Sequence, residues 1–157
     1  MRLLHTRDRR LQDFFDSPTI PQYAILSHTW GDDEVLLEHI RSGKAAKRKA
    51  YTKLVGACAQ ALRDGYEWIW IDTCCIDKTS SAELQEAINS MYRWYLKADI
   101  CYVFLADVPS RAAGWDARFQ QSRWWSRGWT LRTYFFLNPP VLSSPYPLCR
   151  FVFANEG

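Results

Sequence analysis

The sequence YEWIWIDTCCIDK, residues 66–78, decides the fold of this chain. Its apolar run from Trp68 to Ile71 is rich in aromatic and β-branched residues and is too short to be a helix. A second run of the same character extends from Ile100 to Leu105. Uninterrupted apolar runs of this length are typical of strands that are buried on both faces, so we predict two parallel strands.

Two weaker strand patterns lie nearer the N-terminus. Residues Tyr23 to Ser27 form a third apolar stretch, and a short first strand is predicted from Arg2 to His5. A polar stretch from Thr6 to Arg10 follows this strand. The predicted sheet therefore has at least four strands.

Two helix patterns separate the predicted strands. Apolar residues at spacings of three and four indicate a helix from Ala46 to Asp64. A second helix runs to Lys97, and its start is marked by Ser80 with Glu83 three residues later, the pattern of a capping box. Because strands and helices alternate, we expect an α/β fold, with a mainly parallel sheet, right-handed crossovers and helices on both faces.

Composition excludes several classes of protein. The chain has 157 residues, which suits one domain, and its net charge of +3 comes from interspersed acids and bases rather than from a nucleic-acid-binding patch. It has no apolar segment long enough to span a membrane and no secretory leader pattern, so we expect a cytoplasmic protein. Its five cysteines and three histidines lack metal-ligand spacing, and no metal or cofactor is expected.

Candidate chemistry lies where the predicted parallel strands end, because α/β sheets carry their functional groups there. His28 follows one strand, and Asp72 and Asp77 follow the next, so these three residues could act as general acids and bases. The favoured alternative is structural: His28 and Trp30 shape a tight loop, and the aspartates accept backbone N–H groups. Cys74 and the cysteine after it are either an activated nucleophile or small buried hydrophobic residues, and the second alternative is preferred.

A segment after Pro109 is dense in tryptophan and arginine. Its members are Trp115, Arg118, Arg123, Trp124, Trp125, Arg127, Trp129 and Arg132. Together with Trp30, the pair Arg127 and Trp129 could bind a planar anionic ligand such as a dinucleotide, by ring stacking and paired donors to phosphate. The alternative is an aromatic core covered by arginine side chains. Both alternatives remain open at the level of sequence.

Several blocks of the chain resemble the heterokaryon incompatibility (HET) domain of filamentous fungi. The similarity runs in order over about residues 1–131 and includes YAILSHTWGDD at 23–33, YEWIWIDTCCIDK at 66–78 and SRWWSRGWTL at 122–131. The resemblance implies a flavodoxin-like fold related to Toll/interleukin-1 receptor-like (TIR) domains. It also implies a role in self/non-self recognition and programmed cell death, with other signalling proteins, or a second copy, as partners.

The same resemblance raises the question of catalysis. Many TIR-like domains cleave NAD with a glutamate, and the family normally continues from WTL with Gln-Glu-Leu, whereas this chain has Thr133 at the glutamate position. A threonine cannot supply the negative charge that stabilises an oxocarbenium-like transition state. We therefore predict that this chain is inactive as an NADase, with no cofactor; NAD would be the substrate if the chain were active. The alternative is an NAD glycohydrolase that takes its carboxylate from Glu83, Glu86 or Asp72.

The resemblance ends near residue 131. We expect a HET domain over residues 1–137 that is truncated at its C-terminal end, as in a misread gene product. Residues 138–157 contain Asn-Pro-Pro, Ser-Ser-Pro and Tyr-Pro, which favour turns, followed by a short apolar run. This part is predicted to be an irregular tail of no recognised family.

Overall fold

The fold is built on one six-stranded sheet. The computed structural model describes residues 1–14, 19–108, 115–126 and 148–153. The strand order is β2-β1-β4-β3-β5-β6. Strands β4, β3, β5 and β6 are parallel to one another, whereas β1 runs antiparallel to both β2 and β4. The strands are β1 (Arg2–His5), β2 (Leu11–Asp13), β3 (Ala24–His28), β4 (Trp68–Trp70), β5 (Ile100–Leu105) and β6 (Leu148–Phe153).

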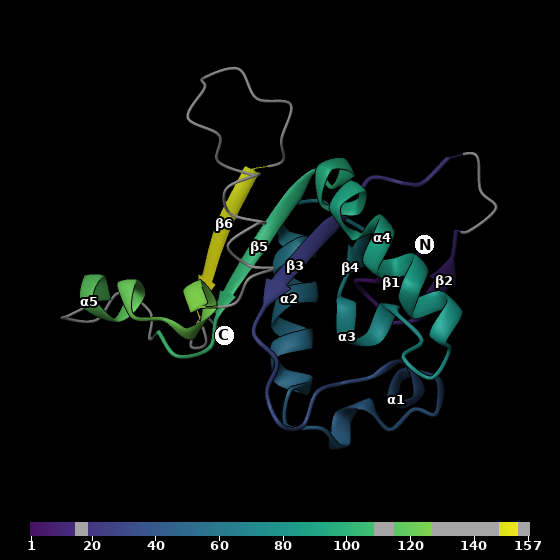
Figure 1. Cartoon of the computed structure of the whole chain (residues 1–157), viewed down its shortest axis with the longest axis horizontal. Coiled ribbons are helices and arrows are strands. Elements are labelled where there is room, and N and C mark those ends of the chain that lie inside the picture. The colour runs from purple at the N-terminus through teal and green to yellow at the C-terminus, as the bar shows by residue number, and fades with distance from the viewer. Residues whose placement is uncertain (15–18, 109–114, 127–147, 154–157) are drawn as a thin grey trace.

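Helices cover both faces of this sheet, as predicted. Figure 1 shows α2 behind the sheet and α4 in front of it. The crossover through α2 leads from β3 to β4 on one side, whereas the crossover through α4 leads from β4 past β3 to β5 on the other side. Crossovers of one hand that run in opposite directions place their helices on opposite faces. The helices are α1 (Leu37–Arg41), α2 (Tyr51–Arg63), α3 (Asp72–Cys75), α4 (Ser81–Lys97) and α5 (Trp115–Gln120), with 3-10 turns η1 (Ala45–Lys47) and η2 (Arg123–Ser126).

The two long helices follow the patterns that predicted them. Helix α2 buries Leu54, Ala57, Cys58 and Ala61 on one stripe, and it ends where Gly65 adopts a φ of 89°, a conformation that glycine reaches without steric cost. It begins at Tyr51, later than predicted, because η1 occupies the residues before it. Helix α4 is capped as predicted, with the Ser80 side chain accepting the backbone N–H of Glu83 at 3.3 Å.

The core lies on both sides of β3 and β5. All five residues of β3 are buried, and Trp70 and Tyr102 are completely buried on the neighbouring strands. Trp124 of η2 joins this core, and its indole Nε1–H donates to the Ser27 hydroxyl at 3.2 Å. The aromatic-core alternative therefore holds for Trp124 in the tryptophan-rich segment.

The structure corrects three local predictions. Residues Leu11–Asp13, which we did not predict as a strand, form β2 and pair with β1. The predicted loop after β4 begins with a single helical turn, α3. The irregular tail predicted over residues 138–157 is wrong for Leu148–Phe153, which pairs with β5 along its whole length. The reason is that β5 would otherwise present a free edge of N–H and C=O groups, which an apolar strand can satisfy. The domain limits at 1–137 stay a prediction.

Candidate functional site

The candidate site lies at the carboxyl ends of β3 and β4, where the order of the strands reverses. The chain leaves β3 toward α2 on one face and leaves β4 toward α4 on the other face. In open α/β sheets the crevice between two such strand ends is the usual place for a site. His28 is the last residue of β3, and Asp72 follows β4 as the first residue of α3.

The structure brings together three of the residues that the sequence analysis selected. The His28 Nε2 atom lies 2.8 Å from Asp72 Oδ1, and the Trp30 indole Nε1–H donates to Asp72 Oδ2 at 2.9 Å. Each carboxylate oxygen therefore accepts one hydrogen bond, and only 1% of the His28 side chain is exposed. Burial acts to raise the pKa of Asp72, but the hydrogen bond from His28 and nearby positive charge outweigh it and hold the pKa below its ordinary value.

Two further residues, Lys53 and Glu34, complete the network, and no pattern in the sequence predicted them. The Lys53 Nζ atom of α2 lies 2.9 Å from His28 Nδ1 and 2.5 Å from Glu34 Oε1. The same Glu34 oxygen accepts the backbone N–H of Gly31 at 2.6 Å. An ammonium group only donates hydrogen bonds, so His28 Nδ1 must accept one, and the remaining ring proton lies on Nε2 and points to Asp72.

This arrangement fixes the chemistry that the cluster can perform. The hydrogen bonds form one continuous series in which each polar side chain contacts the next, in the order Glu34, Lys53, His28, Asp72 and Trp30. A general base needs a free lone pair that faces the substrate, whereas both ring nitrogens of His28 are engaged. The cluster therefore ties the ends of β3 and β4 to α2, in agreement with the structural alternative for His28 and Trp30.

Lys78 lies beside this network but differs from its members in its hydrogen bonding. Its Nζ atom is buried and has no hydrogen-bond partner among the residues that the structure describes. It lies 3.5 Å from the centroid of the Trp30 ring, in the geometry of a cation–π contact. Burial lowers the pKa of Lys78, although the negative charges of Asp72 and Glu34 oppose this effect.

Asp77 stands apart from His28. One of its oxygens, Oδ1, accepts the backbone N–H and the hydroxyl of Thr79 at 3.0 and 2.6 Å. The other lies 3.8 Å from an Arg41 guanidinium nitrogen. Hydrogen bonds from Thr79 hold the pKa of Asp77 below its ordinary value. Asp77 is thus an acceptor that organises the loop before α4, as its structural alternative predicted.

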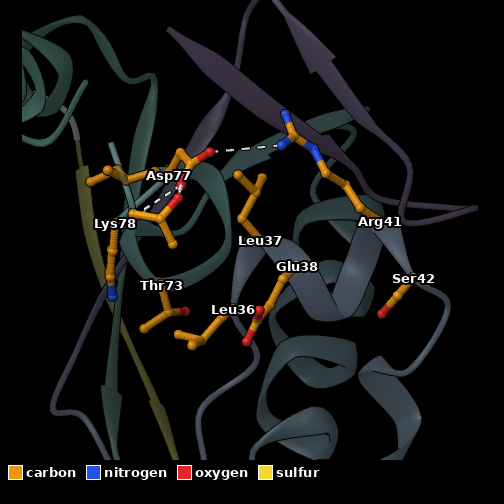
Figure 2. Close-up of a pocket in the computed structure, with 10 residues that line it drawn as sticks. Leu36, Leu37, Glu38, Arg41, Ser42, Thr73, Asp77 and Lys78 are labelled. Atoms are coloured by element: carbon orange, nitrogen blue, oxygen red, sulfur yellow. Dashed lines mark hydrogen bonds and ion pairs between the residues drawn. The ribbon is translucent and has the colours of Figure 1, made fainter. Parts of the chain in front are cut away.

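A pocket of about 460 Å³ opens next to this loop. Figure 2 shows Lys78 and Thr73 on one side of the view and Arg41 and Ser42 on the other. Between these two sides, Leu37 of α1 and the preceding Leu36 supply apolar surface. The pocket is lined by Leu36, Leu37, Glu38, Arg41, Ser42, Thr73, Ile76, Asp77, Lys78 and Thr79.

The remaining carboxylate and thiol candidates lie elsewhere. Glu83 is bound by the Arg2 guanidinium, with contacts of 2.8 and 3.3 Å, and by the backbone N–H of Asp77 at 2.7 Å. Glu86 is exposed on α4. Cys74 is fully buried, and its hydrogen bond with Cys75, together with burial, raises the pKa of its thiol, which opposes formation of a thiolate nucleophile.

Three selected positions fall outside the part of the chain that the structure describes. They are Arg127, Trp129 and Thr133. Across the described ranges, no group of His, Cys, Asp or Glu residues is arranged to hold a metal ion. None of the helices in these ranges has the length and apolar character needed to cross a membrane.

Comparisons with known proteins agree on one family. A family model described as Heterokaryon incompatibility protein (HET) matches residues 23–114. A curated protein, Vegetative incompatibility protein HET-E-1 of Podospora anserina, is 48% identical over 143 residues, which cover 84% of this chain. The chain spans only 10% of the length of that relative. No solved structure was found that matches the chain.

Proposed function

This chain belongs to the heterokaryon incompatibility (HET) family, and from that premise we propose that it is a self/non-self recognition domain that signals without catalysing a reaction. Its relative HET-E-1 is a vegetative incompatibility protein, and a heterokaryon incompatibility role follows from membership of the family. The partners we propose are other incompatibility or signalling proteins in the cytoplasm, or a second copy of this chain.

The closed network at the ends of β3 and β4 supports the absence of catalysis. Each Asp72 oxygen accepts a hydrogen bond within the network, one from His28 and one from Trp30, and the lowered pKa of Asp72 makes it a weak proton acceptor. His28 has no free nitrogen, because Lys53 occupies the other one. A site of this kind rigidifies the fold and presents a defined surface, which suits recognition better than proton transfer.

The residue that stands at the expected glutamate position, Thr133, supports the same proposal. Thr133 carries no charge, and Glu83 of the described carboxylates is already bound by Arg2. The alternative function, a TIR-like NAD glycohydrolase, would need a carboxylate beside an open pocket. Asp77 and Glu38 line the pocket, but Asp77 is held by Thr79 and Arg41.

NAD cleavage tests the catalytic half of the proposal. The purified chain is compared with a version that carries Arg132→Gln, Thr133→Glu and Tyr134→Leu, and nicotinamide release is followed after both have been shown to unfold cooperatively. We expect no release from the unaltered chain. Release from the unaltered chain would overturn the proposal, and release from the altered version alone would identify this chain as a disabled copy of an enzyme.

Expression in a filamentous fungus tests the signalling half. We expect hyphae that produce the chain to lose viability relative to hyphae with an empty vector, and a His28→Gln version with an intact melting transition to be weaker. His28→Gln breaks the link between the two strand ends while keeping a polar side chain of similar reach. Full viability of hyphae that accumulate the folded chain would contradict a signalling role.

A further inference from the structure

The pocket beside α1 and α3 carries a feature that the signalling role does not use. It combines apolar walls with one buried cation, Lys78, that has no hydrogen-bond partner in the described part of the chain. We propose that this pocket binds a small organic anion, whose acidic oxygen pairs with the Lys78 ammonium, and that Trp30 covers this ammonium until the ligand arrives. The inference is independent of the signalling proposal.

The state of Lys78 is the first step. A lysine ammonium has three N–H donors. Leaving a buried donor without a partner costs stability, and the cost is larger for a charged group than for a neutral one. In the described part of the chain the ammonium lies against the Trp30 ring, with 3.5 Å from Nζ to the ring centroid. Buried polar groups in folded proteins nearly always have partners, either in the protein or in water, so an ammonium beside a pocket without a described protein partner is a candidate to pair with a ligand.

The neighbouring carboxylates are engaged with other groups. Asp72 is bound by His28 and Trp30, and Glu34 is bound by Lys53 and the Gly31 N–H. Asp77 is bound by Thr79. No described carboxylate lies within ion-pair distance of the Lys78 ammonium, although Asp72 and Glu34 are near enough to favour its charged form. Within the described ranges no carboxylate uses the donors of this ammonium, which leaves them for an acidic ligand.

The walls of the pocket define the rest of the ligand. Leu36, Leu37 and Ile76 provide apolar surface, and a volume of about 460 Å³ falls in the range of small-molecule sites. Arg41 lies across from Lys78 in Figure 2, and 54% of its side chain is exposed. The ligand class that fits is a compact apolar body with one carboxylate or phosphate group.

Trp30 determines access to the ammonium. Its ring lies over Lys78 Nζ and leaves almost none of that atom in contact with solvent. The indole is 44% exposed, and its Nε1–H donates to Asp72 at 2.9 Å. The proposal requires the indole to move off the ammonium when a ligand oxygen binds, which would couple binding to movement of Trp30.

Binding of simple aromatic anions to the full chain tests the proposal. Phenyl phosphate, benzoate, inorganic phosphate and neutral benzyl alcohol are titrated by calorimetry into the unaltered chain, Lys78→Met, and the matched control Lys47→Met, which removes an exposed lysine. We expect one of the two aromatic anions to bind, with affinity about tenfold or more weaker in Lys78→Met and unchanged in Lys47→Met. The stronger of the two identifies the acidic group.

Other outcomes overturn the proposal. These are equal binding of benzyl alcohol, equal affinity of the Lys78→Met variant with an intact melting transition, or no binding of either aromatic anion. The covering role of Trp30 has its own test in Trp30→Ala, for which we expect tighter binding because the ammonium is already uncovered. Unchanged or weaker binding by folded Trp30→Ala would refute that role.

Discussion

Two buried cations lie at the same edge of the sheet and differ in how their charge is satisfied. Arg2 is 5% exposed, and its guanidinium donates to Asp13 at 2.7 Å, to Glu83 at 2.8 and 3.3 Å and to the Cys75 carbonyl at 3.3 Å. Lys78 has a buried ammonium with none of these bonds to the described residues. The fork of an arginine joins several elements at once, whereas a lysine presents a single point of charge.

The difference indicates that Arg2 has a structural role, whereas Lys78 can bind a ligand. Arg2 starts β1, which runs antiparallel to β4, so its side chain meets the end of β4 and the start of α4. Through Glu83, which also accepts the Asp77 N–H, it holds the loop that carries Lys78. Arg2 therefore holds together the start of β1, the end of β4 and the loop before α4, whereas Lys78 makes no such bonds to the described residues.

Removing the structural cation should have the largest effect. Arg2→Met leaves Glu83 and Asp13 without their common partner, and breaking a buried ion pair costs about 3 kcal/mol or more. Urea unfolding measures this loss as a lower free energy of unfolding. Arg63→Met, which removes an exposed arginine of α2, is the matched control. Equal losses in the two variants would show that the Arg2 cluster does not stabilise the fold.

Neutralising Asp72 should have the next largest effect. Asp72→Asn turns one of two accepting oxygens into a donating amide, so either His28 or Trp30 loses its acceptor. We expect the free energy of unfolding to fall by about 2 kcal/mol, the cost of one buried unpaired polar group. Chemical denaturation with tryptophan fluorescence measures it. An unaltered free energy would mean that the network can rearrange around the amide.

The pH dependence of stability sharpens this result. The pKa of Asp72 is lower in the folded chain than in the unfolded chain, so its contribution is complete above the unfolded value of about 4 and is lost as the pH falls through the folded value. The unaltered chain should therefore lose stability more steeply below about pH 4 than Asp72→Asn does. Parallel acid titrations of the two proteins, followed by circular dichroism, give the comparison, and identical slopes would contradict it.

Removing the available cation should have the smallest effect. Lys78→Met deletes a buried charge that has no described hydrogen bond and keeps the length of the side chain. We expect the free energy of unfolding to stay the same or to rise by about 1 kcal/mol, because the substitution removes the cost of taking a charged group out of water. Thermal melts with Lys47→Met as the control check this. A loss as large as that of Arg2→Met would place Lys78 among the structural cations.

The sequence predicted the parts of the fold that depend on local patterns. The runs at Trp68 and Ile100 became β4 and β5 because strands buried on both faces have to be apolar throughout. Ser80 became the cap of α4, since a cap depends only on residues three positions apart. His28, Trp30 and Asp72 came together because parallel strand ends share an edge of the sheet.

The remaining features depend on contacts between distant residues. Lys53 lies within an ordinary amphipathic helix, and nothing in its surroundings marks it as the partner of His28, 25 positions away. Arg2 has the same character, since its partner Glu83 is 81 positions away. The strand β6 was missed because a short apolar run is ambiguous until an unpaired edge such as that of β5 is known.

The central position of β3 has a consequence for how the chain folds as it is made. Residues Ala24–His28 leave the ribosome long before either neighbour, because β4 begins at Trp68 and β5 at Ile100. At roughly 5–20 residues per second, β3 waits several seconds with both edges unpaired. Pairings this distant in sequence make folding slow. The nascent chain is therefore most exposed to aggregation during that interval, and a chaperone that holds β3 would protect the whole sheet.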